Sequence, residues 1–372
     1  MILDNMILTG LRGLGKTVLL EKFKPIAVQS GWLWAGTDLS ESMSISEENL
    51  VMRILTDLAL ATSSIAIGAK QIRLGFGDTL PPIETKLGYP SLRNMYDSTP
   101  GLAADKLKAV LEFIWPHVEA SGRRGIIFAY DEAQNLADHA AKEQYPLSLL
   151  LDVFQSVQRK GLRLMLVLTG LPTLFPKLVA ARTYTERMFH LVFLSPLDEQ
   201  QTTEAIRKPI EQSKFPIDVT TKSLKLIWEI THGYPYFIQY VCRESFDVWV
   251  QAIDHKEPPP QIPVHEIIRK LDSDFFAGRW AKTSDRQRDL LRLIASLPTC
   301  DAEFTVQEVV NQNKGKQFSS SHINQMLSSL SEAGLVYKNR HGKYSFAVPL
   351  LGDFIRRQEE QEATNPQGEL FE

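Results

Sequence analysis

The sequence has few of the features that mark secreted or membrane proteins. It contains two cysteines, Cys242 and Cys300, which are too few and too far apart for a disulfide framework or a cysteine-rich zinc site. No apolar stretch approaches the roughly 20 residues needed to cross a bilayer, and the amino-terminal segment lacks the basic start and long apolar run of a signal peptide. We therefore expect a cytoplasmic protein with reduced thiols and no membrane partner.

An excess of one charge is also missing. The 41 Lys and Arg residues nearly balance the 44 Asp and Glu residues, which leaves a net charge of -3. Any binding to nucleic acid must therefore come from a local patch. Hydrophobic residues make up 44% of the 372 positions, which excludes disordered and fibrous classes. At about 150 residues per domain, the length predicts two to three domains.

Short apolar runs alternate with helical patterns over the first half of the chain. We predict strands at residues 6–9, 32–38, 125–130, 162–168 and 189–194, with helices near 18–23, 46–58, 103–118 and 147–158. Strands that alternate with helices form a parallel sheet covered by helices on both faces. The fold class is therefore α/β, with a core domain at 1–196. Glycine and proline recur at about 68–101, where we expect an extended, partly irregular insertion.

The strand signals stop after residue 196. Helical patterns at 199–212, 221–231 and 236–251 predict a small helical domain over residues 197–254. Four prolines between residues 258 and 263 cannot lie in a helix interior, so we assign residues 255–283 to a proline-rich linker and a connecting helix.

The C-terminal region has a different pattern. Three helices at 287–295, 306–311 and 321–333 are followed by two short strands around a turn, which is typical of a winged helix-turn-helix over residues 284–357. The tail at 358–372 is acidic and polar, and we expect it to be disordered.

The segment GLRGLGKT, which begins at Gly10, fills the phosphate-loop pattern between a strand and a helix. Its glycines let backbone N–H groups face phosphates, Lys16 reaches the outer phosphates of ATP, and the Thr17 hydroxyl binds Mg²⁺. The alternative is a glycine-rich turn with an exposed lysine. We assign nucleotide binding to Gly10, Gly13, Leu14, Gly15, Lys16, Thr17 and Val18.

Two carboxylates follow the apolar strand at 125–130, and ligands of open α/β sheets bind at this end of a strand. Asp131 would hold Mg²⁺, directly or through water, and Glu132 would polarise the attacking water. The alternative is an acidic cap of the helix that follows.

Three more polar residues are candidates for the site. Thr169 emerges at the end of another strand and would contact the terminal phosphate or its water, or would be an ordinary strand-end hydroxyl. Arg187 and Arg182 lie before the strand at 189–194, and either is a candidate arginine finger that reaches a neighbouring subunit's nucleotide. The alternative for each is a solvated charge on the surface. Of the two we favour Arg187.

Together these segments resemble the AAA+ ATPases, in particular the clade of origin-recognition, transposon-target-selection and secretion-associated ATPases, with overlap toward the STAND ATPases. The resemblance covers most of residues 1–252 and is carried by TGLRGLGKTVLL at 9–20, YDEAQNL at 130–136, LTGLPTL at 168–174, TERMFHLVFLSPLD at 185–198 and HGYPYFIQ at 232–239. It implies Walker A, Walker B and sensor 1 roles for the first three segments, an arginine-finger role for Arg187, and a helical lid.

The chain departs from this pattern in two places. Many members of the clade carry an arginine in the lid where this chain has Gly233, Tyr234, Pro235 and Tyr236. The Gly-Tyr-Pro sequence is more like that of STAND and archaeal relatives. Arg243 is an outside candidate for the role of the lid arginine. Nine residues precede Gly10, whereas family members usually have some tens of residues there that help to form the adenine pocket. We expect weaker nucleotide affinity than in a version extended upstream.

The predicted winged helix is mildly basic, with ten Lys and Arg against seven acids between residues 284 and 357. Residues 321–333 would be the recognition helix, and Lys338, Arg340 and Lys343 would lie on the wing near DNA phosphates. Because that helix has no arginine for a bidentate guanine contact, phosphate-led binding is favoured over sequence readout. The alternative is a winged helix that packs on the lid or binds protein.

These features predict an Mg²⁺-dependent ATPase whose nucleotide state controls homo-oligomer formation through the ATP sites and the engagement of DNA or a DNA-bound partner. The alternative is a STAND-type switch or scaffold that recruits a separate effector protein in bacterial signalling or defence.

Overall fold

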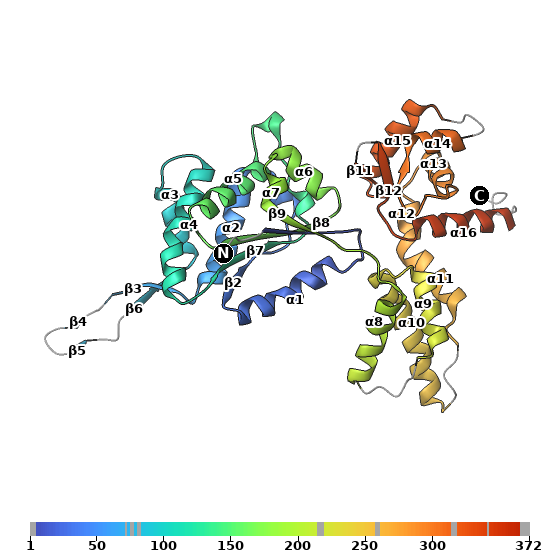
Figure 1. Cartoon of the computed structure of the whole chain (residues 1–372), viewed down its shortest axis with the longest axis horizontal. Coiled ribbons are helices and arrows are strands. Elements are labelled where there is room, and N and C mark those ends of the chain that lie inside the picture. The colour runs from blue at the N-terminus through green and yellow to red at the C-terminus, as the bar shows by residue number, and fades with distance from the viewer. Residues whose placement is uncertain are drawn as a thin grey trace. The chain divides into compact units, whose positions relative to one another are not determined.

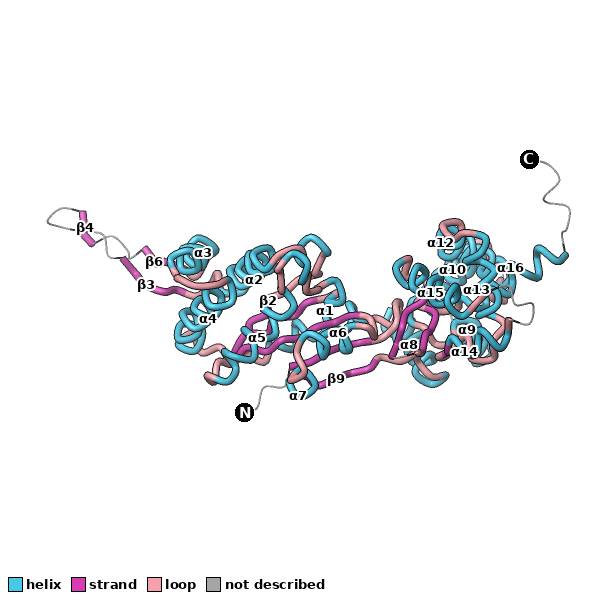
Figure 2. Tube along the Cα trace, turned by 90° about the horizontal axis from the view of Figure 1, so that it is seen from above, coloured by secondary structure: helices cyan, strands magenta, loops and turns pink. Residues whose placement is uncertain are grey.

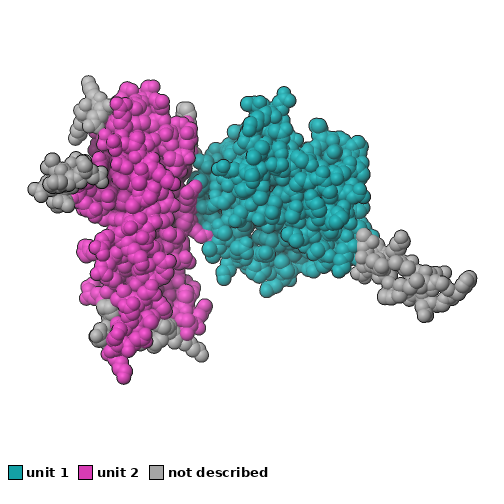
Figure 3. All heavy atoms as spheres, turned by 180° about the vertical axis from the view of Figure 1, so that it is seen from behind, with its two compact units in different colours: residues 1–10, 16–194 teal, residues 11–15, 195–372 magenta. Residues whose placement is uncertain are grey.

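The structure is a computed structural model of the chain, and it describes residues 5–70, 73–74, 78–79, 83–213, 219–256, 261–313, 318–340 and 342–364. The chain forms two compact units, which are described separately (Figure 3). The first contains residues 1–10 and 16–194, and the second contains residues 11–15 and 195–372. None of the helices in the described ranges combines the length and apolarity that a bilayer crossing requires.

A five-stranded parallel sheet forms the centre of the first unit, which confirms the predicted fold class. Its strand order is β2 (Trp32–Ala35), β7 (Gly125–Tyr130), β8 (Leu164–Gly170), β1 (Asn5–Thr9) and β9 (Phe189–Phe193). Thr9 pairs with Gly170, and Tyr130 with Leu168. The residues that follow β1, β7 and β8 therefore meet at one edge of the sheet.

Helices cover both faces of this sheet (Figure 1). Because side chains alternate along a strand, Ile7 and Phe128 face one apolar core and Leu8 and Ile127 face another. The first core includes α2 (Glu47–Thr62), α4 (Ala103–Ala120), α5 (Pro146–Arg159) and α6 (Leu174–Ala181), and the second is covered by α1 (Lys16–Gln29). The unit also contains the short helices η1 (Glu41–Ser44), η2 (Ala133–Asn135), η3 (Ala140–Lys142) and α7 (Thr185–Met188).

The prediction of an irregular insertion at 68–101 is wrong for part of this range. Strand β3 (Ala66–Lys70) pairs antiparallel with β6 (Ile83–Lys86) in a ribbon that extends away from the sheet (Figure 2). The short strands β4 (Arg73–Leu74) and β5 (Asp78–Thr79) lie beyond this ribbon (Figure 1). Tyr89–Ser98 is a regular helix, α3, with Leu92 and Tyr96 buried against α2 and α4. Sequence reasoning missed it because Pro90 suggested a break, although proline is tolerated in the first turn of a helix.

In the second unit, the expected lid helices are α8 (Glu199–Ser213), α9 (Thr221–Thr231) and α10 (Pro235–Asp254). The prolines predicted to stiffen a linker fall largely at 257–260, outside the described residues. After them come α11 (Val264–Leu271), the π-helical segment η4 (Asp272–Ala277) and α12 (Gly278–Trp280). Leu271 and Phe276 are buried in one apolar core with Phe237 of the lid and Leu290 of the C-terminal module. Residues 264–280 are therefore packed elements and do not act as a spacer.

The C-terminal module contains α13 (Asp285–Ala295), α14 (Val306–Gln312) and α15 (Ser320–Glu332) with an antiparallel sheet. The sheet order is β10 (Phe304–Thr305), β12 (Lys343–Phe346) and β11 (Val336–Arg340). The expectation of a disordered tail from residue 358 is corrected over 358–364, which belong to helix α16 (Leu351–Thr364). This helix is held by buried Phe354 and Ile355 and by an ion pair of Arg292 with Glu362 at 2.7 Å. The predicted domain boundaries stay a prediction.

Candidate functional site

The site begins in the loop between β1 and α1. Gly13 and Gly15 both have φ of +82°, a left-handed conformation that favours glycine. Lys16 is buried, and its Nζ donates to the carbonyl of Gly10 at 3.0 Å. Leu14 is buried and Val18 is exposed on the first turn of α1. The two left-handed glycines and the bond between Lys16 and Gly10 fit a tight turn between β1 and α1.

Asp131 lies at the centre of the site in the first unit. It follows β7 directly and is almost fully buried. The Thr17 hydroxyl donates to Asp131 Oδ2, the Thr169 hydroxyl donates to Oδ1, and the backbone N–H of Glu132 donates to Oδ1 at 2.7 Å. Three segments distant in the sequence thus meet around one carboxylate. Thr17 and Asp131 present hard oxygen atoms side by side, and this donor set fits Mg²⁺.

The backbone of Asp131 is fixed by the segment after β2. Its N–H donates to Thr37 O at 3.1 Å, and its carbonyl accepts from Leu39 N at 2.9 Å. This close approach depends on Gly36, whose φ is +144° and at which an added Cβ would lie 1.8 Å from the carbonyl oxygen of Ala129. A residue with a side chain at this position would push the two strand ends apart. Gly36 was not among the predicted site residues.

Glu132 is exposed beside Asp131, in a left-handed backbone conformation with φ of +52°. Gln134 Nε2 donates to Glu132 Oε2, and Gln134 Oε1 accepts from the backbone N–H of Leu171 at 3.1 Å. The Lys177 ammonium donates to the Gln134 carbonyl at 2.7 Å, and burial lowers the pKa of Lys177. Gln134 therefore links Glu132 to the residue that follows β8. Sequence reasoning missed it, although a polar residue two positions after Glu132 was a signal.

Thr169 is fully buried beside Asp131 and donates its hydroxyl proton to that carboxylate. In this arrangement the threonine orients the predicted metal ligand. Its contact with a terminal phosphate stays a prediction.

The two candidate finger arginines have different surroundings. Arg182 forms a bidentate pair with Asp152, with N···O distances of 2.9 and 2.7 Å. Burial raises the pKa of Asp152, but the hydrogen bonds from Arg182 and Tyr184 outweigh it and lower the pKa overall. Arg187 is exposed on α7, and no carboxylate pairs with it in the parts of the chain that the structure describes. These positions favour a structural role for Arg182.

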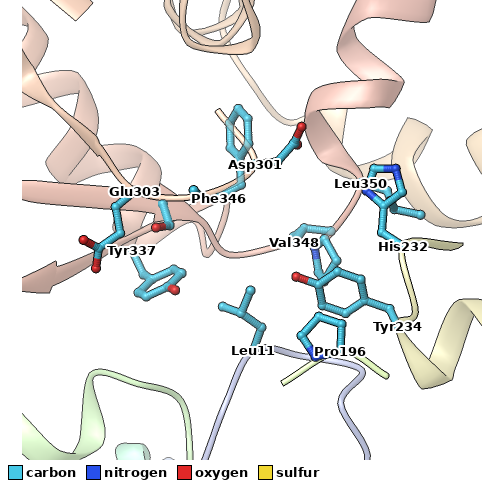
Figure 4. Close-up of a pocket in the computed structure, with 13 residues that line it drawn as sticks. Leu11, Pro196, His232, Tyr234, Asp301, Glu303, Tyr337, Phe346, Val348 and Leu350 are labelled. Atoms are coloured by element: carbon cyan, nitrogen blue, oxygen red, sulfur yellow. The ribbon is translucent and has the colours of Figure 1, made fainter. Parts of the chain in front are cut away.

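In the second unit, loop residues 11–15 contact the lid. The Gly13 carbonyl accepts from Tyr236 N at 3.1 Å, and an added Cβ at Gly13 would lie 3.0 Å from the Tyr236 Cβ. Leu11 lines a cavity of about 440 Å³ together with Tyr234, Tyr337 and Val348 (Figure 4). The Gly-Tyr-Pro turn at residues 233–235 is thus followed directly by a residue that is hydrogen-bonded to the loop between β1 and α1.

Comparisons with known proteins agree with this architecture. No curated protein matches the sequence. A family described as "Domain of unknown function (DUF8462)" matches residues 273–355. The structure is similar to the Walker-type ATPase paby2304 of Pyrococcus abyssi, with 16% identity over 94% of this chain and 90% of that chain and a TM-score of 0.54. It is also similar to the ORC2 protein of Aeropyrum pernix in ADPNP–ADP complexes, with 12% identity over 97% and 89% and a TM-score of 0.52.

At these identities the likeness shows the fold. The chain has the AAA+ P-loop fold found in the origin-recognition clade, which confirms at the level of the fold the resemblance seen in the sequence.

Proposed function

We propose that this chain is an Mg²⁺-dependent ATPase whose nucleotide state controls its self-assembly and its engagement of DNA or a DNA-bound partner. The observation that supports this most is the convergence of Thr17, Thr169 and Glu132 on the Asp131 carboxylate at the carboxyl edge of the sheet. A buried carboxylate beside a threonine hydroxyl, next to a glycine loop with a lysine, is the arrangement that phosphoryl transfer needs.

Each residue has a distinct part in this proposal. Thr17 and Asp131 would hold Mg²⁺, which neutralises charge on the outer phosphates when bound. Lys16 exchanges its bond with the Gly10 carbonyl for a phosphate oxygen. Glu132 orients the attacking water and accepts its proton, because it is the exposed carboxylate of the pair while Asp131 is held by three donors.

The test is ATP binding and phosphate release by the full chain. Lys16→Ala removes the phosphate contact and is expected to weaken nucleotide binding, whereas Glu132→Gln is expected to bind ATP and release little phosphate. Lys160→Ala is a matched control, because this lysine lies on the surface in an ion pair with Glu112. Undiminished hydrolysis in both site variants would reject the proposal.

Self-assembly is proposed from the position of Arg187. It precedes β9, whose first residue Phe189 pairs with Asn5 at the start of β1. From Asn5 at that edge to Thr9 at the nucleotide edge, β1 spans about 13 Å at about 3.3 Å per residue. We infer that Arg187 acts on the ATP of a neighbouring subunit, because the length of β1 separates its end of the sheet from the edge that would hold the nucleotide.

Mixing two inactive variants tests this. Arg187→Ala keeps a complete Walker set, and Glu132→Gln keeps the arginine, so a mixture is expected to recover activity that neither has alone. Arg207→Ala, at an exposed arginine of α8, is the control and should behave as wild type. If the mixture stays inactive, the finger assignment is wrong.

Engagement of DNA is proposed from the C-terminal module, read as a winged helix. Ser321, Asn324 and Gln325 are exposed along α15, Lys338 is exposed on β11, and Lys343 forms an ion pair with Glu303 at 3.2 Å. Binding led by phosphate contacts should lose affinity steeply as the salt concentration rises.

A second candidate is a nucleotide switch that recruits a separate effector protein. The direct bond between Tyr236 of the lid turn and Gly13 of the phosphate loop supports it, because such a tie would let the lid respond to nucleotide without DNA. A partner protein that copurifies with the chain, together with no DNA binding at low salt, would favour this candidate.

A further inference from the structure

A cavity of about 370 Å³ lies between α11, α12, α13 and α16 of the second unit (Figure 1). Its volume is in the range of sites that hold a small ligand or one group of a larger ligand. Six of the residues that line it carry a charge, an indole or an amide: Arg269, Asp272, Trp280, Arg288, Gln358 and Gln361. The phosphate loop, α15 and β11 contribute none of the described lining residues, so the cavity is separate from the sites proposed above.

The indole of Trp280 is held in one orientation by two neighbours. Its ring packs edge-to-face on the buried Phe354, with ring centroids 5.9 Å apart. The Arg288 guanidinium lies over the same ring, with Cζ 5.6 Å from the centroid, and donates to the Trp280 carbonyl at 3.4 Å. Trp280 is only partly buried, so it offers an oriented aromatic surface to the cavity. Aromatic rings and guanidinium planes are the groups on which unpaired bases stack.

The charges that line the cavity are mainly positive. Asp272 is buried, and Arg357 binds both of its oxygens, with Nε 2.9 Å from Oδ2 and Nη2 donating to Oδ1. Arg288 pairs with Asp285 at 3.4 Å, but the Asp285 side chain is 96% exposed and solvent screens this pair. Arg269 is exposed, and no carboxylate pairs with it in the parts of the chain that the structure describes. The carboxylate is therefore neutralised within the protein, and the cavity favours an anion.

Amide groups line the side of the cavity formed by α16. Gln358 and Gln361 lie one helical turn apart, and Gln358 Nε2 donates to Gln361 Oε1 at 3.5 Å. An amide both donates and accepts hydrogen bonds, as the edges of bases do. An aromatic platform, positive charge and amides thus fit the base and the phosphate of a nucleotide.

We propose that this cavity binds one unpaired nucleotide, whose base stacks on Trp280 and whose phosphate contacts Arg269. A base within a duplex is stacked and paired and cannot enter such a cavity, whereas a base of a single strand can. The inference deepens the proposed engagement of DNA, on which it rests, by naming a single strand as a form that the second unit binds. A free nucleotide has the same chemistry, and the experiment separates the two sources.

The test is titration of the full chain with fluorescently labelled oligothymidylate, followed by anisotropy. Trp280→Leu is expected to weaken binding by about five- to hundredfold, as for the loss of one stacked base. Trp115→Leu is the matched control, because the Trp115 ring on α4 also lies under an arginine, Arg163 at 5.1 Å, but does not line the cavity. It should bind as wild type does.

A salt series tests the phosphate contact. Arg269→Gln is expected to reduce the slope of log affinity against log salt by about 0.7, as for one phosphate of a single strand, whereas Trp280→Leu should leave the slope unchanged. Arg207→Gln, at an exposed arginine of α8, is the control and should keep the wild-type slope. Because Arg269 is exposed, its variant keeps the test decisive even if thermal unfolding shows that Trp280→Leu is not folded.

Calorimetry with thymidine monophosphate separates the two sources. Binding that is lost in Trp280→Leu would assign the cavity to a free nucleotide, and no such binding beside a Trp280-dependent oligothymidylate affinity would assign it to a single strand.

Other outcomes would overturn the inference. Wild-type affinity for oligothymidylate in both Trp280→Leu and Arg269→Gln would do so, and so would displacement of the strand by polyglutamate as readily as by unlabelled oligothymidylate, because any acidic segment would then fit. Wild-type protein that binds duplex DNA but neither the single strand nor the monophosphate would overturn this inference alone. Wild-type protein that binds neither form of DNA would instead refute the proposed engagement of DNA.

Discussion

Gln134 offers the sharpest test of how the site works, because one side chain links Glu132 to the end of β8. Gln134→Ala removes the N–H donor to the Glu132 carboxylate and the acceptor of the Leu171 N–H. A hydrogen bond to a charged group contributes about 1.5–3 kcal/mol, and tenfold in rate corresponds to about 1.4 kcal/mol. Since Glu132 is exposed and therefore screened by solvent, we expect the lower end of this range, a fall in kcat of about tenfold.

The assay is steady-state phosphate release with the KM for ATP measured alongside. A positioning role predicts a lower kcat with nearly constant KM, because the phosphate-binding residues are untouched. Gln134→Glu is expected to be at least as impaired, since a second carboxylate repels Glu132. Gln144→Ala is the control: its Oε1 accepts from Glu47 N at 3.0 Å, away from the site, so kcat should not change. A folded Gln134→Ala protein with wild-type or higher kcat would refute the positioning role.

Two further predictions concern stability. Gly36→Ala is expected to lower the free energy of unfolding in urea by about 3 kcal/mol, because the added Cβ would clash with the carbonyl oxygen of Ala129. Gly122→Ala is the control and should lower it by about 1 kcal/mol, since the space around Gly122 is open. Equal effects of the two substitutions would contradict the packing argument. Arg182→Ala should cost about 0.5–1 kcal/mol at neutral pH, since its pair with Asp152 is partly exposed. The pKa of Asp152 is lowered in the folded state, so the stability difference between wild type and Arg182→Ala should shrink as the pH falls below the ordinary value of 3.8. A stability difference that persisted at lower pH would show that the ion pair with Asp152 is not its cause.

Much of the first unit was predictable from sequence because each signal was local. Apolar runs gave the strands of the parallel sheet, and the glycine spacing before Lys16 gave the phosphate loop. Helix α3 was missed because Pro90 breaks a helix in most positions, whereas here it lies in the first turn. Helix α16 was not predicted, and the charges of its second half suggested a solvated tail, while Arg292, distant in the sequence, pairs with Glu362 of that half.

The candidate site was predictable in its parts but not in its connections. The motifs identified Thr17, Asp131 and Glu132 by residue type and by their place at strand ends. They did not show that the Thr169 hydroxyl binds Asp131 or that Gln134 holds Glu132, since these contacts depend on strand register and backbone conformation.

The sequence by itself determined the α/β class, the phosphate loop and the acidic strand end, because periodicity and motif spacing act over a few residues. Only the tertiary structure decided which arginines are paired with carboxylates. It pairs Arg182 with Asp152 and Arg243 with Glu244, whereas Arg187 has no carboxylate partner among the residues that the structure describes. Charge pairing depends on distances between segments far apart in the chain, and the order of residues does not contain those distances.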